Sequence, residues 1–403
     1  MRLTSVLHKA RESQYFKRLW KDRKTLRRIK DYGVPKPLLQ QGAQVYDALD
    51  VARTREEQQA FELPEPHCEP VTAAQDSRNP DWHDTEAYLV HNKTRLLEGA
   101  KHMCLLTKTI RCEGTPKPLQ GYESPQHEAA AFDALWRAHL GDCVHRKLPR
   151  KLDLRRPHYR DIREYGVPIQ RRVSLILDNF NELCEKLTSH EPGAMERALF
   201  KDLYSRVSIQ KDDGNLLVFT SHVDSVLTSL KPLAAPSPPE EVSATADAPL
   251  PDLFPVKYTL DLDTSHIYRM DDFFPLGGNK QRHVHTLHVT HPYYYFWFPQ
   301  QKLARAIQAC FTFAAAQARH LYGVDTLTPP EPVVVQCTYS DVDSMGFLVY
   351  QLNTLRLSND DGVKNQVWVK EAEPLYSACS HKDGLQGHDG LLFDHYLALY
   401  RSS

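Results

Sequence analysis

Four histidines in a short stretch are the residues whose type and spacing come closest to a chemical site. They are His283, His285, His288 and His291. On a strand, His283 and His285 share one face, and two neighbouring imidazoles are suitable zinc ligands. No carboxylate or cysteine lies close in sequence, however, and His288 falls on the opposite face. The pattern favours a polar strand face over a zinc site, and we expect neither a metal nor another cofactor.

The next candidate is a run of six aromatic residues, Tyr-Tyr-Tyr-Phe-Trp-Phe at 293–298. Aromatic rings near basic residues stack on unpaired bases in many RNA-binding proteins. Adjacent side chains of a strand alternate between its two faces, so at least half of these rings must lie in the interior or at an interface. Interior packing or a protein interface is therefore the favoured interpretation, and base stacking is the alternative.

Motifs of nucleophilic catalysis and phosphate binding are missing from the chain. It contains no Gly-x-Ser-x-Gly, no Gly-x-x-x-x-Gly-Lys and no Gly-x-Gly-x-x-Gly. Its eight cysteines include no Cys-x-x-Cys pair, which indicates free thiols in a reducing compartment. We therefore predict that the protein is not an enzyme.

Positive charge is distributed unevenly along a chain whose formal net charge is only −1. Residues 1–30 hold eleven lysines and arginines against two acids, a local charge of +9. Apolar residues three and four apart among these cations predict an amphipathic helix. Such a helix is typical of a mitochondrial targeting segment, and it also suits a basic arm that lies on phosphates. A solvated helix or tail is the remaining interpretation.

A second basic stretch, residues 145–172, contains ten arginines and lysines against three acids. A helix that starts near Pro157 would align Arg156, Arg160 and Arg163 in one stripe. Planar guanidinium groups suit phosphate oxygens, so this stretch is the candidate contact with RNA. A solvated or intraprotein surface is the competing interpretation. The candidate RNA-binding residues are Arg155, Arg156, Arg160, Arg163, Arg171 and Arg172.

Hydrophobic periodicity places elements around these stretches. We expect helices over 85–109, 126–140, 173–187, 301–322 and 391–400, and strands at 206–210, 215–220, 257–262, 283–290, 333–339, 347–352 and 366–370. The turn signal Asp212-Asp213-Gly214 predicts a hairpin between the first two strands. Helices and strands that alternate without a repeat predict an α+β or α/β fold, with a mixed β-sheet covered by helices and an extended basic N-terminal arm.

Composition divides the chain into five expected parts. They are a basic amphipathic targeting segment or arm (1–30), an extended Pro-containing arm (31–84), a helical part with the basic stretch and the hairpin (85–230), a Pro/Ala-rich linker or loop (231–255) and an α/β part (256–403). Seven prolines in residues 231–255 predict that this segment is mobile. The chain has no run of about 18 apolar residues, so we expect no membrane-spanning helix.

Several blocks of the sequence resemble a known family. They are Tyr-Leu-Val-His at 88–91, Ala-Gln-Ala-Arg-His-Leu-Tyr-Gly at 316–323, Pro-Val-Val-Val-Gln at 332–336, Phe-Leu-Val-Tyr-Gln-Leu-Asn-Thr at 347–354 and Gly-Val-Lys-Asn at 362–365. Together they resemble the mitochondrial large-subunit ribosomal proteins numbered thirty-seven. A paralogous family, programmed cell death protein nine, shares the Gln-Leu-Asn-Thr region. The matches cover residues 85–400 in patches.

The resemblance implies a structural subunit of the mitochondrial large ribosomal subunit, bound to the ribosome in the matrix, that pairs with this paralogue. With the basic stretches it leads us to expect ribosomal proteins and mitochondrial rRNA as partners. In the matching blocks, Asn353, Lys364, Asn365 and Trp368 are candidate partner contacts. The favoured alternative is that they satisfy a tight connection within the chain. Two other classes stay open: a mitochondrial RNA-binding protein outside the ribosome, and a soluble matrix enzyme of unknown reaction.

Overall fold

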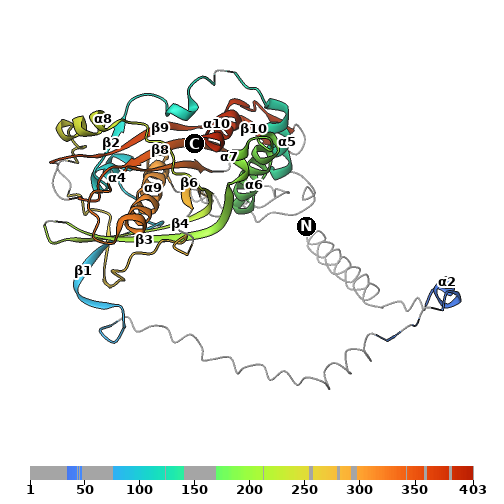
Figure 1. Cartoon of the computed structure of the whole chain (residues 1–403), viewed down its shortest axis with the longest axis horizontal. Helices are drawn as coiled ribbons and strands as arrows, with labels where there is room; N and C mark the ends of the chain where they lie inside the picture. The colour runs from blue at the N-terminus through green and yellow to red at the C-terminus, as the bar shows by residue number, and fades with distance from the viewer. Residues whose placement is uncertain are drawn as a thin grey trace, which may run out of the picture. The chain divides into compact units, whose positions relative to one another are not determined.

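A hairpin of two long strands is part of the sheet of this protein (Figure 1). Its strands are β3 (Ala198–Gln210) and β4 (Leu216–Ser229), and they pair antiparallel along almost their whole length. The turn between them uses Gly214 at a φ of +85°, a conformation that glycine adopts without strain. The predicted hairpin is confirmed, and both strands extend further from the turn than the alternation of the sequence indicated.

The computed structural model describes residues 34–42, 44, 46–47, 76–122, 124–139, 169–211, 213–253, 257–278, 282–291, 297–341, 343–357, 361–380 and 384–402. It divides into two units, Met1–Thr72 and Ala73–Ser403. In the first unit the described part contains the short helix α2 (Lys36–Gln40). The predicted targeting segment 1–30 and most of the basic stretch 145–172 lie outside the described residues. No helix among the described residues is long and apolar enough to span a membrane.

The sheet of the second unit contains nine strands in the order β2-β9-β8-β7-β6-β4-β1-β5, with β3 paired to β4. The remaining strands are β1 (Trp82–Val90), β2 (Thr109–Cys112), β5 (Asp263–Ile267), β6 (His283–Thr290), β7 (Val333–Ser340), β8 (Ser344–Leu352) and β9 (Asn365–Pro374). A separate pair is formed by β10 (Ala378–Ser380) and β11 (Gly384–Gln386). Parallel and antiparallel pairs both occur, so the prediction of a mixed sheet is confirmed.

Two strands share one edge of β4. β1 pairs in parallel with the first residues of β4, and β6 pairs antiparallel with its last residues. At the fork, the side-chain amide of Asn92 bonds the backbone of His222, with its Nδ2 donating to the carbonyl at 2.7 Å and its Oδ1 accepting from the N–H at 3.2 Å. Gln308 Nε2 donates to the carbonyls of Val90 and Thr220 at 3.1 and 2.9 Å. Side chains thus satisfy backbone groups that no strand reaches.

Helices cover both faces of the sheet. On one face lie α9 (Pro299–Tyr322) and α4 (Ala100–Leu106), and on the other lie α5 (Glu128–His139), α6 (Ile169–Leu187) and α10 (Leu391–Arg401). Pro299 at its first turn and Gly323 at a φ of +106° after its end bound α9, which begins two residues before the predicted helix 301–322. Its alanine-rich surface is buried almost all round, which is typical of a core helix. Short turns of helix complete the chain: η1 (Lys117–Leu119), α7 (Pro192–Met195), α8 (Pro239–Ala244) and η2 (Thr245–Asp247).

Two predicted elements are wrong. The helix expected over 85–109 is instead β1, a turn, α4 and β2, because β1 gains partners on both sides from β4 and β5. Gly99, at a φ of +54°, packs directly against the start of α9, where a Cβ would lie 2.7 Å from the carbonyl carbon of Gln300. The strand expected at 257–262 is a series of turns in which Asp261 has a φ of +66°, and β5 begins only after it.

The proline-rich segment from 231 to 253 is packed against the folded unit. It carries α8 and η2, and Leu233, Ser237, Thr245 and Leu253 are buried. The composition left two interpretations open, a linker or a loop. The described residues form a loop that packs against the folded unit.

Candidate functional site

The family motifs meet at the connection from β8 to β9, where a group of polar side chains is buried. Asn353, Lys364 and Asn365 are 5%, 1% and 0% exposed, and Gln351 and Gln366 beside them are also buried. Buried amide and ammonium groups are stable only when their donors and acceptors are paired. We call these five residues the polar connection.

Asn365 is fully paired within the chain. Its Oδ1 accepts hydrogen bonds from the backbone N–H groups of Asn353 and Thr354 at 2.8 and 2.9 Å. Its Nδ2 donates to the carbonyls of Thr107 and Thr354 at 2.9 and 3.0 Å. The side chain therefore closes the turn after β8 and holds the start of β2 beside it, because Thr107 lies just before that strand.

Lys364 holds the loop of α8 and η2 onto the sheet. Its ammonium group donates to the carbonyls of Thr245, Ala246 and Gly362 at 3.1, 2.9 and 3.3 Å, and its backbone N–H donates to Thr245 Oγ1 at 2.9 Å. An ammonium group has three protons, and each has an acceptor here. The last carbonyls of a helical turn carry partial negative charge, which favours a cation at this place.

Ser237 joins the same loop to both strands. Its backbone N–H donates to Gln351 Oε1 at 3.0 Å, and its Oγ accepts from Gln366 Nε2 at 3.2 Å. Asn353 lies between these two glutamines: it accepts from Gln351 Nε2 at 3.0 Å and donates to Gln366 Oε1 at 3.3 Å. The polar connection thus fixes the chain path of three segments that are far apart in sequence.

The structure separates the four candidate partner contacts into two groups. Asn353, Lys364 and Asn365 are used inside the fold, which agrees with the alternative that they satisfy a tight connection. Trp368 on β9 is half-buried and packs against the apolar cluster on the α10 side of the sheet. Of the four, it alone presents a substantial part of its surface for a contact with another molecule.

The histidine strand is β6, as predicted, but the expected alternation is broken at His285. Val284 pairs with Thr228 and Thr286 pairs with Leu227, so His285 is an extra residue opposite the β4 ladder, a β-bulge. His285 Nε2 lies 2.9 Å from the carbonyl oxygen of Ser402, whereas His283 Nδ1 lies 3.1 Å from Gln317 Nε2 on α9. The two imidazoles contact different elements and do not form the pair on which the zinc alternative rested.

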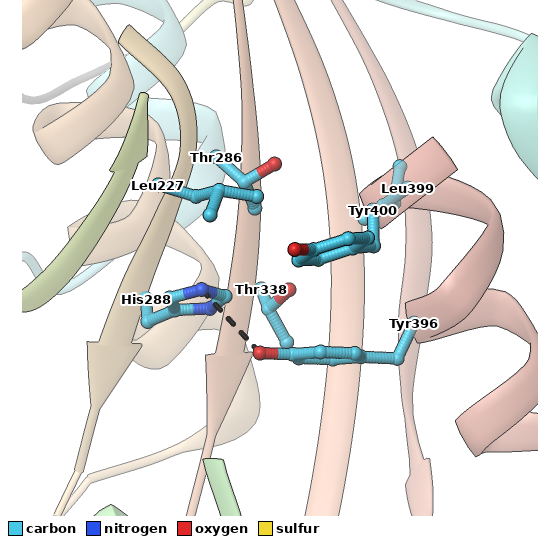
Figure 2. Close-up of a pocket in the computed structure, with 7 residues that line it drawn as sticks. All are labelled: Leu227, Thr286, His288, Thr338, Tyr396, Leu399 and Tyr400. Atoms are coloured by element: carbon cyan, nitrogen blue, oxygen red, sulfur yellow. Dashed lines mark hydrogen bonds between the residues drawn. The ribbon is translucent and has the colours of Figure 1, made fainter. Parts of the chain in front are cut away.

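His288 is enclosed between the sheet and α10 (Figure 2). Its ring stacks on Tyr396 with 5.5 Å between centroids, and the Tyr396 hydroxyl lies 3.4 Å from Nε2. The space around the two rings leaves no room for a water molecule, so it is a packing gap and not a ligand pocket. Burial lowers the pKa of His288 to about 3 and that of His285 to about 4. Both imidazoles are therefore neutral at pH 7.

His291 and the aromatic run meet at the start of α9. The ring of His291 lies 6.0 Å from that of Trp297, over which the guanidinium group of Arg95 sits at 5.9 Å. Burial lowers the pKa of His291 well below its ordinary value. Trp297 is half-buried and Phe298 is exposed, whereas residues 293–296 lie outside the described residues. The two described rings thus differ in environment, and base stacking by the run stays a prediction.

Among the candidate RNA-binding residues, the structure describes two. Arg171 and Arg172 lie in the first turn of α6, where Arg171 is exposed and Arg172 is half-buried. Arg172 is close enough to His139 to lower the pKa of that histidine, which burial brings to about 4. Arg155, Arg156, Arg160 and Arg163 lie outside the described residues.

A further buried charge was not foreseen from the sequence. Asp394 on α10 is fully buried, accepts the backbone N–H of Gln126 at 2.6 Å, and lies 2.6 Å from His127 Nδ1. From another helix it thus holds the two residues that directly precede α5. Nothing in the sequence signals this contact, because the partners are 268 and 267 positions apart. Ser237 and Thr245 were missed for the same reason.

The buried polar side chains described above are arranged to stabilise the fold. Among the residues that the structure describes, no three His, Cys, Asp or Glu side chains are grouped to bind a metal ion. The thiols of Cys104, Cys184 and Cys310 are buried, and burial raises their pKa, which suppresses the nucleophilic thiolate. The polar side chains with the most complete hydrogen bonding are those of the polar connection.

Comparison with known proteins places the chain among ribosomal proteins. The model of a family described as mitochondrial 28S ribosomal protein S30 (PDCD9) matches residues 300–400. Large ribosomal subunit protein mL37 of Bos taurus is 31% identical over 306 residues, 74% of this chain and 68% of that protein. The same protein of Rattus norvegicus is 30% identical over 75% and 70% of the two chains. That of Gallus gallus is 26% identical over 78% and 73%.

Proposed function

The chain belongs to the family of large ribosomal subunit protein mL37, and from this premise we propose that it is a structural component of the large subunit of the mitochondrial ribosome, where it supports mitochondrial translation. The observation that carries the proposal is the match to three mL37 proteins over about three quarters of the chain. The geometry supports it, because the polar residues of the family motifs are used to fix the fold. A structural role of this kind requires no catalytic group.

The family model and the curated relatives are named after different subunits of the ribosome. The family model carries the description 28S, whereas the curated relatives carry the name of the large subunit. The model matches only residues 300–400, and the relatives match about three times as much of the chain, so we assign the protein to the large subunit. The shared C-terminal region supports a second point of the proposal, that the chain pairs with its paralogue, programmed cell death protein nine.

Sedimentation tests the assignment. A tagged copy of the chain, expressed in cells, is expected to co-sediment with the large subunit of the mitochondrial ribosome under conditions that separate the two subunits. Sedimentation with the small subunit would contradict the assignment. Recovery near the top of the gradient would favour the two other classes, and treatment with RNase separates them, because it shifts an RNA-bound protein and leaves a matrix enzyme in place.

Contact with rRNA is the next part of the proposal, and it rests on the charge of residues 145–172. The six candidate residues are Arg155, Arg156, Arg160, Arg163, Arg171 and Arg172, and the exposed Arg171 at the start of α6 supports it. Reversal of Arg156, Arg160 and Arg163 to glutamate is expected to release the protein from large subunits at lower salt. Each lost phosphate contact reduces the slope of log affinity against log salt by about 0.9.

A matched control reverses three exposed cations elsewhere, Lys101, Lys257 and Arg356. It changes the net charge by the same amount but is expected to leave the salt dependence close to that of the natural chain. Equal salt dependence for both triple variants, with folding shown by circular dichroism, would contradict an RNA contact in this stretch.

Location follows from the same assignment. We propose that the protein acts in the mitochondrial matrix, bound to the ribosome, and that residues 1–30 direct its import. The support is their local charge of +9 and their amphipathic spacing. Residues 1–30 fused to a fluorescent protein are expected to give mitochondrial fluorescence, and a diffuse cytosolic signal would leave them as a basic arm.

A further inference from the structure

Three strands lie at the edges of the described nine-stranded sheet, and one of them differs from the other two. β2 and β5 are four and five residues long, whereas β3 has thirteen. β2 carries an ion pair between Arg111 and Glu371, and β5 carries the carboxylate of Asp263, which lies 2.9 Å from His91 Nε2. Short length and charge are the usual protection of an edge strand against pairing with another chain. β3 lacks the first of these protections.

Half of the β3 edge is already covered by the chain itself. Arg206 and Phe273 exchange two backbone hydrogen bonds, at 3.1 and 2.9 Å, as neighbouring strands do. The backbone N–H of Ser208 donates to Asp272 Oδ1 at 3.0 Å, and its carbonyl accepts from Arg319 at 2.9 Å. This part of the edge thus shows that an added segment pairs here in the manner of a strand.

The other half of the edge, from Ala198 to Ser205, has no such added segment among the described residues, and at its start Thr228 Oγ1 donates to the carbonyl of Ala198 at 3.0 Å. Tyr204 lies opposite His222, whose backbone groups bond Asn92 on the far edge of β4. Opposite residues of an antiparallel pair either bond each other or both point away, so the N–H and carbonyl of Tyr204 point outward. Arg206, two residues on, points the same way. No described residue bonds the backbone of Tyr204.

Exposed apolar side chains surround this free edge. Phe200 and Tyr204 on β3 are each 37% exposed, and Met270 and Phe273 beside them are 54% and 47% exposed. The rings of Tyr204 and Phe273 lie 6.0 Å apart and form a small aromatic surface. An exposed group of large apolar residues on a folded protein marks a contact with another molecule more often than a solvated face.

The charges at this edge are paired. Lys201 bonds Asp178 at 2.7 Å, Asp202 bonds His222 at 2.7 Å, and Arg206 bonds Asp271 at 2.9 Å. Lys201 and Arg206 each face a carboxylate, so the edge carries no excess of positive charge to attract phosphates. Asp202 turns the chain within this edge, with a φ of +61° and no partner in the β4 ladder, and Tyr204 after it carries the free backbone donor and acceptor. These two groups, with apolar side chains on either side, match the backbone of an extended peptide.

We propose that the β3 edge, residues 198–205, accepts an extended segment of a neighbouring polypeptide, which adds to the sheet as a further strand. The added strand continues the line that Phe273 begins and places apolar side chains against Tyr204 and Phe273. This proposal rests on the proposed function in one respect: the neighbouring polypeptide is expected in the large ribosomal subunit. It commits to a different protein, and neither RNA nor a second copy of this chain is the partner.

Photo-crosslinking tests the proposal with the full chain. Tyr204 is replaced by p-benzoylphenylalanine, which keeps an aromatic ring of similar width, and intact cells are irradiated before lysis. A covalent adduct that resists RNase and is destroyed by protease is expected. The matched control places the same residue at Thr264, an exposed position on the β5 edge, where no adduct is expected.

The outcomes separate this proposal from the proposed function. An adduct with RNA, an adduct of twice the mass of this chain, or equal adducts at both positions would overturn strand addition at β3. A protein adduct found away from the large subunit would support strand addition at β3 and contradict the ribosomal assignment. A second measurement is hydrogen exchange of the amides in 198–205, which is expected to be slower by at least tenfold in the assembled particle than in the isolated chain. Equal exchange rates would also overturn the proposal.

Discussion

The polar connection and the histidine strand both bury polar side chains in one sheet, yet they bury them in different ways. Every donor of Asn365 and of the Lys364 ammonium has an acceptor within the chain. On β6 and directly after it, by contrast, His288 Nδ1 and His291 Nε2 are buried without a partner among the described residues. Paired groups stabilise one chain path, whereas unpaired imidazoles cost stability and stay neutral to limit that cost. Buried polarity alone therefore does not indicate a reactive site.

Asn365→Ala is the substitution with the largest expected effect on this comparison. It leaves the buried N–H groups of Asn353 and Thr354 without their acceptor, and each such group costs about 1–3 kcal/mol. A loss of roughly 3–5 kcal/mol in the free energy of unfolding follows, measured by urea denaturation. Gln120→Ala, at an exposed amide with one bond to Thr115, is the control and should change stability by less than about 0.5 kcal/mol. Similar values for the two variants would contradict the structural role of Asn365.

His288→Phe tests the other half of the comparison through pH. The pKa of His288 is about 3 in the folded protein against an ordinary 6.5. Below pH 6.5 the unfolded chain binds a proton that the folded chain does not, so stability is lost as the pH falls. The loss amounts to roughly 2 kcal/mol at pH 5 for this one group. Phenylalanine keeps the stacking on Tyr396 and removes this loss.

At pH 7 the free energy of unfolding of His288→Phe is thus expected to be close to that of the natural chain. At pH 5 it is expected to be about 2 kcal/mol larger than that of the natural chain. Urea denaturation at the two pH values measures the difference. The same change at His190, whose side chain is 74% exposed, is the control and should leave the pH dependence as it is. An unchanged pH dependence in His288→Phe would show that His288 is protonated in the fold.

Lys364→Met is expected to have the smallest effect of the three, about 1–2 kcal/mol. The methionine fills the space of the lysine stem, but the carbonyls of Thr245 and Ala246 lose a donor. Because these carbonyls belong to the loop of α8 and η2, amide exchange in residues 237–247 should rise more than exchange in β8. Lys257→Met, at an exposed lysine, serves as the control. Uniformly faster amide exchange over the whole unit would contradict the view that Lys364 stabilises this loop locally.

Sequence reasoning succeeded where local pattern and long-range packing agree. α9, β6 and α10 were placed within two residues of their ends, because each is bounded by a local signal and buried along its length. It failed from 85 to 109, where Leu89, Leu96 and Met103 are spaced like the face of a helix. There, pairing of β1 with two distant strands decided the outcome.

The candidate site divides in the same manner. Asn353, Lys364 and Asn365 were singled out because they lie at the ends of predicted strands in the blocks that resemble the family, and the structure places them together. Thr245, which bonds Lys364, and Ser237, which bonds the neighbouring Gln351 and Gln366, come from a proline-rich loop. That loop lies about 110 to 130 positions away, and no spacing rule links it to these residues. The bulge at His285 was equally hidden, since it arises from the register of β6 against β4 and not from the residues of β6 alone.

The pairing of β2 with β9 has a consequence for the order in which the protein folds. Thr109 pairs with Asn365, 256 positions later, and β1 likewise pairs with β5, which comes much later in the chain. Among the described strands of the sheet, β3–β4 and β7–β8 are antiparallel pairs that close through short turns. These hairpins form first, and the loop entropy of the distant pairs delays the rest. Until residues 365–374 have been synthesised, β2 and the buried amides around it are open to water. The chain therefore completes its sheet late in synthesis, and it depends until then on protection from aggregation.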